Sequence, residues 1–258
     1  MTTVNEIIKL IEKTAPLALA YEWDNSGLLI GSRDKEVNRI YITLDTNKYT
    51  VDEAISLGAD MIVSHHPIMF RGVNQIDHDT PSGYVISELI KHDIALYAAH
   101  TSMDCAKGGI NDVLAEKLGI TGTEIIEKNP GFPGCGLGRI GTVKEQTLKE
   151  LAQTVKKALN TPFVRVSGDP EKIIKRAAVG GGACDELIPA ARNMCADVMV
   201  TADMKYHITM DSVESGIAVI DAGHYPTEVF VTDIFKNILK DCGAELLISS
   251  EKDIFEVM

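Results

Sequence analysis

The feature that most constrains the fold of this chain is a regular alternation of short apolar runs with amphipathic segments of helical period. Apolar runs bounded by turn residues predict buried strands, and apolar residues spaced three and four apart predict helices. Strands separated by helices are typical of α/β layers with a largely parallel sheet. The predicted strands cover 39–45, 60–65, 94–100, 137–143, 162–166, 173–181, 197–202, 216–224 and 244–250. The predicted helices cover 1–16, 48–58, 82–93, 109–119, 147–160, 184–195, 203–216 and 226–241.

One glycine-rich stretch interrupts this alternation. Residues 128–138 hold four glycines and two prolines, a composition typical of loops. We place there the crossing into a second unit. The first predicted unit comprises residues 1–127 plus about 222–258, and the second comprises about 128–221. Within the second unit, Thr147 and Glu150 have the spacing of a capping box at the start of a helix.

The charge and the cysteines exclude several classes of protein. Lys and Arg number 25 against 37 Asp and Glu, so the net charge of −12 argues against a broad nucleic-acid surface. No apolar run approaches the roughly 20 residues of a membrane span. The amphipathic N-terminus lacks the pattern of a signal peptide. The five cysteines include no CxxC pair, which together with the missing signal predicts reduced thiols and a cytoplasmic location.

Histidines occur at the predicted carboxyl ends of three strands, the edge at which open α/β sheets bind ligands. They are His65 with His66, His100, and His224. Asp104 lies four residues after His100, and Glu228 lies four residues after His224. His207 follows another strand end, and Asp203 precedes it by four residues on the same predicted helix face.

The adjacent pair His65 and His66 suggests two metal sites rather than one. Successive side chains on a strand point to opposite faces, so we expect the two rings to diverge and to suit two neighbouring ions. Imidazole nitrogens and carboxylate oxygens fit Zn, Fe, Mn or Co better than Ca or Mg. The alternative is that each histidine is a hydrogen-bonded core or loop residue.

Two further segments allow more than one interpretation. The loop around Trp23, the only tryptophan, is either packed by that ring or lines a substrate site. The three glycines at 180–182 follow a predicted strand and lack a phosphate-loop pattern, so we interpret them as a tight turn.

Five motifs in order resemble the Nif-three-like family, often labelled GTP cyclohydrolase I type 2 homologs. They are EWDNSGLLIG (22–31), VSHHP (63–67), HTSMD (100–104), TADMKYH (201–207) and DAGHYPTE (221–228). The resemblance implies two similar α/β units, with a dinuclear metal site at the strand ends between them. It also implies that two divalent ions are bound by the matching residues, which are His65, His66, Asp104, His224 and Glu228. A homohexamer with the metals facing inward is a further implication.

Two functions follow as hypotheses. The first is a dinuclear metal-dependent hydrolase, in which metal-activated water attacks a small nucleotide-like or phosphoester substrate. His100, Asp203 and His207 are then the candidates for catalytic proton transfer. The second is a non-catalytic metal-binding ring scaffold or regulatory protein, which would need the same ligands. The additional acid–base groups favour the enzyme, because a storage site does not require them.

Overall fold

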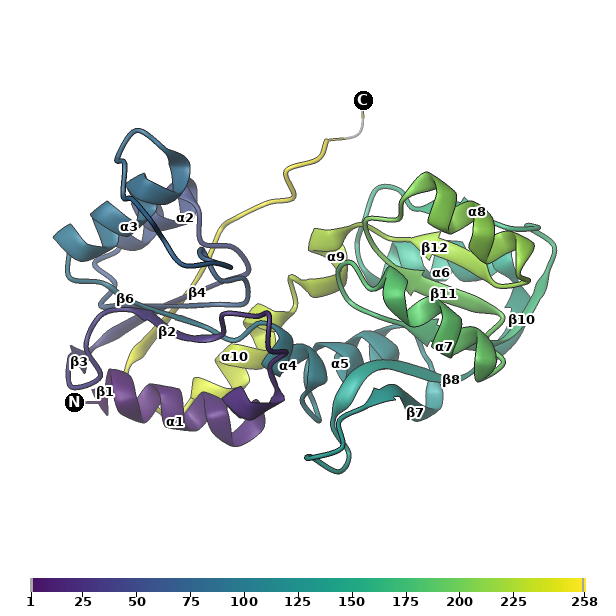
Figure 1. Cartoon of the computed structure of the whole chain (residues 1–258), viewed down its shortest axis with the longest axis horizontal. Coiled ribbons are helices and arrows are strands. Elements are labelled where there is room, and N and C mark those ends of the chain that lie inside the picture. Colours follow the sequence, from purple (N-terminus) through teal and green to yellow (C-terminus); the bar gives the residue numbers. More distant parts are fainter. Residues whose placement is uncertain (1, 257) are drawn as a thin grey trace. The chain divides into compact units, whose positions relative to one another are not determined.

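The computed structural model describes residues 2–256 and 258, and these form two compact units (Figure 1). The first unit contains Met1–Ala106 and Val231–Lys252. The second contains Lys107–Phe230 and Asp253–Met258. No helix in the described part of the chain is both long and apolar enough to cross a membrane. No disulfide joins the cysteines within the same residues.

The first unit is a layered α/β structure, as predicted. Its main sheet has the order β13-β4-β5-β6-β2, in which β13, β4, β5 and β6 are parallel and β2 is antiparallel. Its elements are β1 (Thr2–Thr3), α1 (Val4–Thr14), η1 (Leu17–Leu19), β2 (Gly27–Ile30), β3 (Glu36–Val37), β4 (Arg39–Thr43), α2 (Lys48–Ser56), β5 (Met61–Ser64), α3 (Pro81–Lys91), β6 (Ala95–Ala98), α4 (Thr101–Cys105), α10 (Val231–Leu239) and β13 (Glu245–Ile248).

Helices cover both faces of this sheet (Figure 1). On one face Tyr41, Ile62 and Leu96 of the three central strands pack against Val51 of α2 and Leu89 of α3. Helices α1 and α10 lie on the other face (Figure 1). Burial on both faces explains why the central strands read as continuous apolar runs rather than as alternating patterns.

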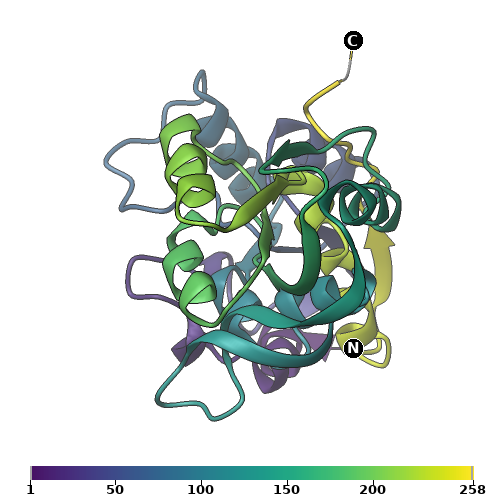
Figure 2. The ribbon, with the colours of Figure 1, turned by 90° about the vertical axis from the view of Figure 1, so that its right-hand side faces the viewer.

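The second unit repeats this architecture with a mixed sheet of order β7-β8-β10-β11-β12-β9. Strands β10, β11 and β12 are parallel, whereas β7, β8 and β9 join by antiparallel pairing. Helices α7 and α8 lie on one face and α6 on the other (Figure 2). The elements are α5 (Ile110–Lys117), β7 (Thr121–Lys128), β8 (Gly136–Thr147), α6 (Leu148–Ala158), β9 (Arg165–Ser167), β10 (Ile173–Val179), η2 (Asp185–Leu187), α7 (Ile188–Asn193), β11 (Val198–Thr201), α8 (Tyr206–Glu214), β12 (Ala218–Asp221) and α9 (His224–Glu228).

The unit boundaries differ from those predicted. The glycine-rich stretch 128–138 contains the turn of a hairpin, because β7 pairs with β8 in antiparallel register from Thr121 to Lys128. Residues 107–127 therefore belong to the second unit, and the chain crosses after Ala106. The return crossing follows Phe230 instead of residue 221, because α9 remains with the second unit. A hairpin turn and a linker share the same composition, which is why the sequence did not separate them.

Candidate metal centre

Three histidines of the first unit come together at the carboxyl edge of its sheet. His65 and His66 follow β5, and His100 follows β6. The ring centroids of His65 and His66 are 4.8 Å apart, and those of His100 lie 5.2 Å from His65 and 5.4 Å from His66. Each ring offers a nitrogen such that all three nitrogens lie within 4.8 Å of one another, close enough to share an ion. These three residues are called the histidine cluster below.

In each member of the histidine cluster, Nδ1 faces an oxygen that accepts a hydrogen bond. The pairs are His65 with the Ala99 carbonyl (2.9 Å), His66 with Asp45 Oδ1 (2.8 Å) and His100 with Asp24 Oδ1 (2.8 Å). A carbonyl or carboxylate oxygen carries no proton to donate, so Nδ1 must carry the proton. The lone pair of each neutral ring then resides on Nε2. Metal-binding histidines are oriented in this way by carboxylate or carbonyl partners.

Asp24 is the most elaborately held of these oxygen partners. Its Oδ2 accepts hydrogen bonds from the Thr101 hydroxyl (2.6 Å) and backbone (3.1 Å) and from the Ser26 hydroxyl (2.7 Å). Burial alone would raise the pKa of Asp24. The hydrogen bonds from His100, Thr101 and Ser26 outweigh burial and hold that pKa well below its usual range. Asp24 therefore stays ionised and keeps His100 in one orientation.

Asp104 adds a carboxylate to the same edge of the first unit. It lies in the short helix α4 and is 6% exposed. Its Oδ1 is 3.6 Å from His65 Nε2, longer than a hydrogen bond. An imidazole nitrogen and a carboxylate oxygen at this separation could bind one ion together, and this donor set suits Zn, Fe, Mn or Co.

The second unit places a comparable donor group at its own carboxyl edge. His224 Nδ1 lies 2.7 Å from Asp203 Oδ2, and its Nε2 lies 2.9 Å from Glu228 Oε2. His224 and Glu228 are four residues apart in α9, so they project from one face of that helix. Asp203 therefore orients the ring, in the role that Asp24 and Asp45 have in the first unit.

Gly182 provides the space that this second group needs. A Cβ atom at this position would lie 2.2 Å from Glu228 Oε1 and 3.2 Å from His224 Nε2. Its φ of +63° is also a conformation that residues with a side chain rarely adopt. The glycine turn after β10 is thus part of the site, a role that the sequence did not reveal.

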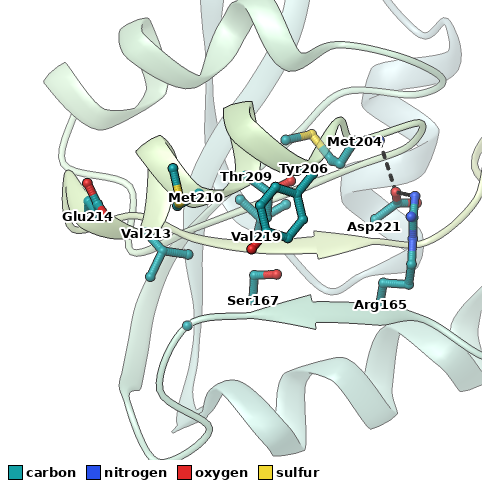
Figure 3. A pocket seen from close by; sticks show the side chains of 11 residues that line it. Arg165, Ser167, Met204, Tyr206, Thr209, Met210, Val213, Glu214, Val219 and Asp221 are labelled. Carbon is teal, nitrogen blue, oxygen red and sulfur yellow. Dashed lines mark hydrogen bonds and ion pairs between the residues drawn. The ribbon is translucent and has the colours of Figure 1, made fainter.

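Asp221, at the end of β12, connects this donor group to a neighbouring cavity (Figure 3). Its Oδ2 accepts a hydrogen bond from the Met204 backbone (3.0 Å), and its Oδ1 accepts one from the Gly223 backbone (3.1 Å). These two amides directly follow Asp203 and directly precede His224. Asp221 therefore positions both partners of the Asp203–His224 hydrogen bond. It also forms an ion pair with Arg165.

Two expectations about the histidines are wrong. The rings of His65 and His66 do not diverge, because β5 ends at Ser64 and both residues lie beyond the strand, where side chains need not alternate. Asp203 and His207 do not share a helix face, because α8 begins only at Tyr206. Asp203 instead has a left-handed φ of +54°.

The candidate catalytic residues lie in three different settings. His100 belongs to the histidine cluster, and Asp203 is bonded to His224. His207 is exposed on α8 against the Tyr206 ring, and no potential metal-binding group among the described residues includes it. Asp24 and Asp45 were not predicted. The available signal was their position: Asp45 is the last residue of the predicted strand 39–45, and Asp24 lies in the Trp23 loop.

Comparisons with known proteins agree with the resemblance in the motifs. Residues 2–253 match the family described as Duf34/NIF3 (NGG1p interacting factor 3). The GTP cyclohydrolase 1 type 2 homolog of Clostridium perfringens is 38% identical over 259 residues, covering 98% of both chains. The Bacillus cereus protein related to NIF3 has a TM-score of 0.91 at 29% identity, covering 99% of both chains.

A second solved structure provides a third match. Reduced HcgD from Methanocaldococcus jannaschii has a TM-score of 0.81 at 31% identity, covering 96% of this chain and 98% of that one. The matches extend over nearly the whole chain and include both units. The chain therefore belongs to the Duf34/NIF3 family.

Proposed function

We propose that this protein is a metal-dependent hydrolase whose centre is built on the histidine cluster. The observation that carries the proposal is that every cluster member has Nδ1 held by an oxygen acceptor, which leaves Nε2 of His65 and His66 to bind metal and Nε2 of His100 to accept a proton. In the dinuclear form of the proposal, His65, His66 and Asp104 of the first unit and His224 and Glu228 of the second supply the ligands. Two divalent ions (Zn, Fe, Mn or Co) would lower the pKa of a bound water and offset negative charge on the substrate.

His100 is the residue we assign to proton transfer. It lies within the cluster, and the ionised Asp24 beside its Nδ1 stabilises the imidazolium that forms when Nε2 accepts a proton. Asp203 acts in this proposal by orienting His224. His207 has no assigned part, because it is exposed on α8.

Two exposed aromatic rings favour a substrate with a planar ring. Trp23 and Phe70 are 60% and 50% exposed, and their centroids lie 5.9 Å and 5.6 Å from that of His100. Tyr21 stacks on Trp23 with an interplanar angle of 14° and supports one face of it. Exposed aromatic faces stack on nucleobases without strict sequence preference. A nucleotide-like substrate fits these rings better than an alkyl phosphoester.

The alternative is a metal-binding scaffold without turnover. One observation favours it: of the three predicted acid–base groups, Asp203 is occupied by His224 and His207 is exposed, which leaves only His100. The two functions therefore differ in what His100 does.

Metal analysis and a turnover screen test the proposal. The purified protein, reconstituted with Zn, Mn or Fe, should contain close to two ions per chain, and His66→Ala should contain fewer. His207→Ala is the matched control and should keep the full content. The protein should then be screened against nucleotides and phosphoesters. One ion or none in the reconstituted wild type would contradict the dinuclear form.

The role of His100 separates enzyme from scaffold. If it transfers protons, His100→Ala should retain metal and lose about 10²–10⁴-fold in rate on the substrate found. If it only supports metal binding, excess metal should restore the variant fully. No turnover on any nucleotide or phosphoester by metal-loaded wild type would favour the scaffold.

A further inference from the structure

A cavity of about 590 Å³ lies in the second unit between helix α8 and the sheet edge formed by β12 and β9 (Figure 3). This volume falls within the range of about 300–1,000 Å³ that is usual for sites that bind small molecules. All residues that line the cavity belong to the second unit. They are Arg165, Ser167, Gly168, Met204, Tyr206, Thr209, Met210, Val213, Glu214, Val219 and Asp221.

The roof of the cavity is one stripe of α8. Its members have the spacing i, i+3, i+4, i+7 and i+8 from Tyr206 to Glu214, which defines a single helix face. A helix face that carries apolar side chains at this spacing normally packs into the core. Here Tyr206, Met210 and Val213 remain 78%, 41% and 37% exposed. The sheet below them ends in β9, which is only three residues long, and within the described residues no further strand pairs with its outer edge.

The floor is one face of the β9–β12 pair. The antiparallel register places Arg165 opposite Asp221 and Ser167 opposite Val219. Residues two apart on a strand share a face, so all four project into the cavity. The floor therefore has an ion pair at one end and smaller side chains along the rest (Figure 3).

Arg165 can accept an anion at that end. Its side chain is 63% exposed, and among the described residues its guanidinium bonds only to Asp221, through Nη2. The other guanidinium N–H groups keep their hydrogen-bonding capacity. Asp221 is itself engaged by Met204, Gly223 and Arg165. Asp221 thus fixes the guanidinium in place, and its own charge is largely balanced.

Glu214 lies at the opposite end of the cavity from Arg165 (Figure 3). Its carboxylate would repel a second negative group there. The two ends therefore discriminate between ligands: a negative group is favoured beside Arg165 and disfavoured beside Glu214.

We propose that this cavity binds a small monoanionic ligand. Its apolar, preferably planar body lies between the α8 stripe and Val219, and its single carboxylate or sulfonate bonds to Arg165. Arginine binds such groups through two parallel hydrogen bonds, which gives directional recognition. The site is separate from the metal-centre proposal and does not depend on it.

Two fluorescent probes test two questions separately. One is whether the cavity recognises an anion, and the other is whether its apolar residues bind an aromatic body. The first is 8-anilinonaphthalene-1-sulfonate, and the second is N-phenyl-1-naphthylamine, the same ring system without the sulfonate. The wild-type protein, in the assembly in which it is purified, should bind the sulfonate saturably, with one site per chain. It should bind the neutral amine at least about tenfold more weakly, since a charge-assisted hydrogen bond contributes on this order.

Three variants locate the binding. Arg165→Gln should weaken sulfonate binding about tenfold or more and should leave the neutral amine unchanged. Met210→Glu, on the partly exposed roof, should weaken both probes. Arg192→Gln is the matched control, because it removes an exposed arginine of the same unit outside the cavity and should change neither affinity.

Three outcomes would overturn the proposal. Equal sulfonate affinity in the wild type and Arg165→Gln would show that the arginine does not recognise the anion. Equal affinity of the wild type for both probes would leave only an apolar groove. Probe binding that appears only when the purified assembly is diluted to monomers would assign the cavity to a second copy of the chain.

Discussion

At the scale of single residues, four histidines share one arrangement. His65, His66, His100 and His224 each have Nδ1 beside an oxygen acceptor, supplied by a carbonyl in the first case and by an aspartate in the other three. The same Nδ1 arrangement therefore occurs in both units. The oxygen partners should therefore influence metal affinity without binding metal themselves.

Asp45→Ala tests this influence. The substitution removes the acceptor of His66 Nδ1, so the ring loses its preferred tautomer and orientation. Metal affinity should fall about 10–100-fold, the usual effect of losing such a partner. Titration of the metal-free protein measures it, and full occupancy should return at high metal concentration. Unchanged affinity would mean that Asp45 has no part in orienting His66.

Gly182→Ala tests the space beside Glu228. Its matched control is Gly119→Ala, because Gly119 has a similar φ of +69° but no atom within 4 Å of the added Cβ. Both variants should lose about 1–2 kcal/mol of stability from the left-handed backbone alone. Only Gly182→Ala displaces Glu228, so only this variant should also bind metal more weakly. Equal metal affinity in the two variants would remove Gly182 from the site.

At the scale of elements, the sequence predicted the start of a helix correctly where a side chain hydrogen-bonds to the backbone of its own helix. The predicted capping box at Thr147 is confirmed: Thr147 Oγ1 accepts from the Glu150 backbone (3.2 Å), and Glu150 Oε2 accepts from the Thr147 backbone (2.8 Å). Helix α1 begins with the same arrangement at Thr3 and Glu6. These contacts span three residues, so tertiary structure cannot easily alter them.

Thr147→Ala should destabilise the second unit by about 1 kcal/mol, the usual effect of losing an N-cap hydroxyl. The reason is that the Glu150 backbone N–H, in the first turn of α6, loses its acceptor. Denaturant unfolding of the metal-free protein measures the change. A loss near zero would show that water replaces the hydroxyl without cost.

The capping box should also depend on pH. Hydrogen bonds from the Thr147 backbone and then from its hydroxyl lower the pKa of Glu150 below 4.5. A lowered folded-state pKa means that this stabilisation is present above pH 4.5 and is lost as the pH falls through the folded value. Glu150→Gln keeps an acceptor oxygen but does not titrate. The difference in unfolding midpoint between wild type and Glu150→Gln should therefore change between pH 7 and pH 3, whereas a constant difference would contradict the assignment.

At the scale of the whole molecule, the two units have the same plan. Each has a central set of parallel strands, and in each unit the residues that follow those strands include side chains that could bind metal and the aspartates that orient them. The family motifs are divided between the units, so neither unit holds the complete predicted ligand set. The proposal that the donors of both units act together rests on the family resemblance.

We also predict assembly beyond a dimer, on the basis of the family resemblance. Light scattering at micromolar concentration should give a mass well above twice the chain mass of 28.0 kDa, and a hexamer is the expected state. The exposed aromatic and aliphatic side chains of α8 provide a control. If Tyr206→Ser leaves the mass unchanged, the α8 stripe is not part of the subunit contact, as the ligand proposal for the cavity requires. A monomeric wild type would contradict the predicted assembly.

The sequence by itself determined the layered α/β class, most element positions and the strand-end placement of His65, His66 and His100. Apolar periodicity, caps and turn residues are short-range properties, and they survive in any tertiary context that buries the same faces. Strand-end residues could be predicted to meet because parallel strands bring their carboxyl ends to one edge.

Only the tertiary structure decided which atoms meet within those edges. The Asp24–His100 and Asp203–His224 pairs join residues separated by 76 and 21 positions, and the register of strand pairing selects them. The β7–β8 hairpin and the cavity under α8 likewise depend on which strand is a neighbour and on where the sheet ends. Periodicity along the chain carries no information about the register between strands, so these contacts could not be read from the sequence.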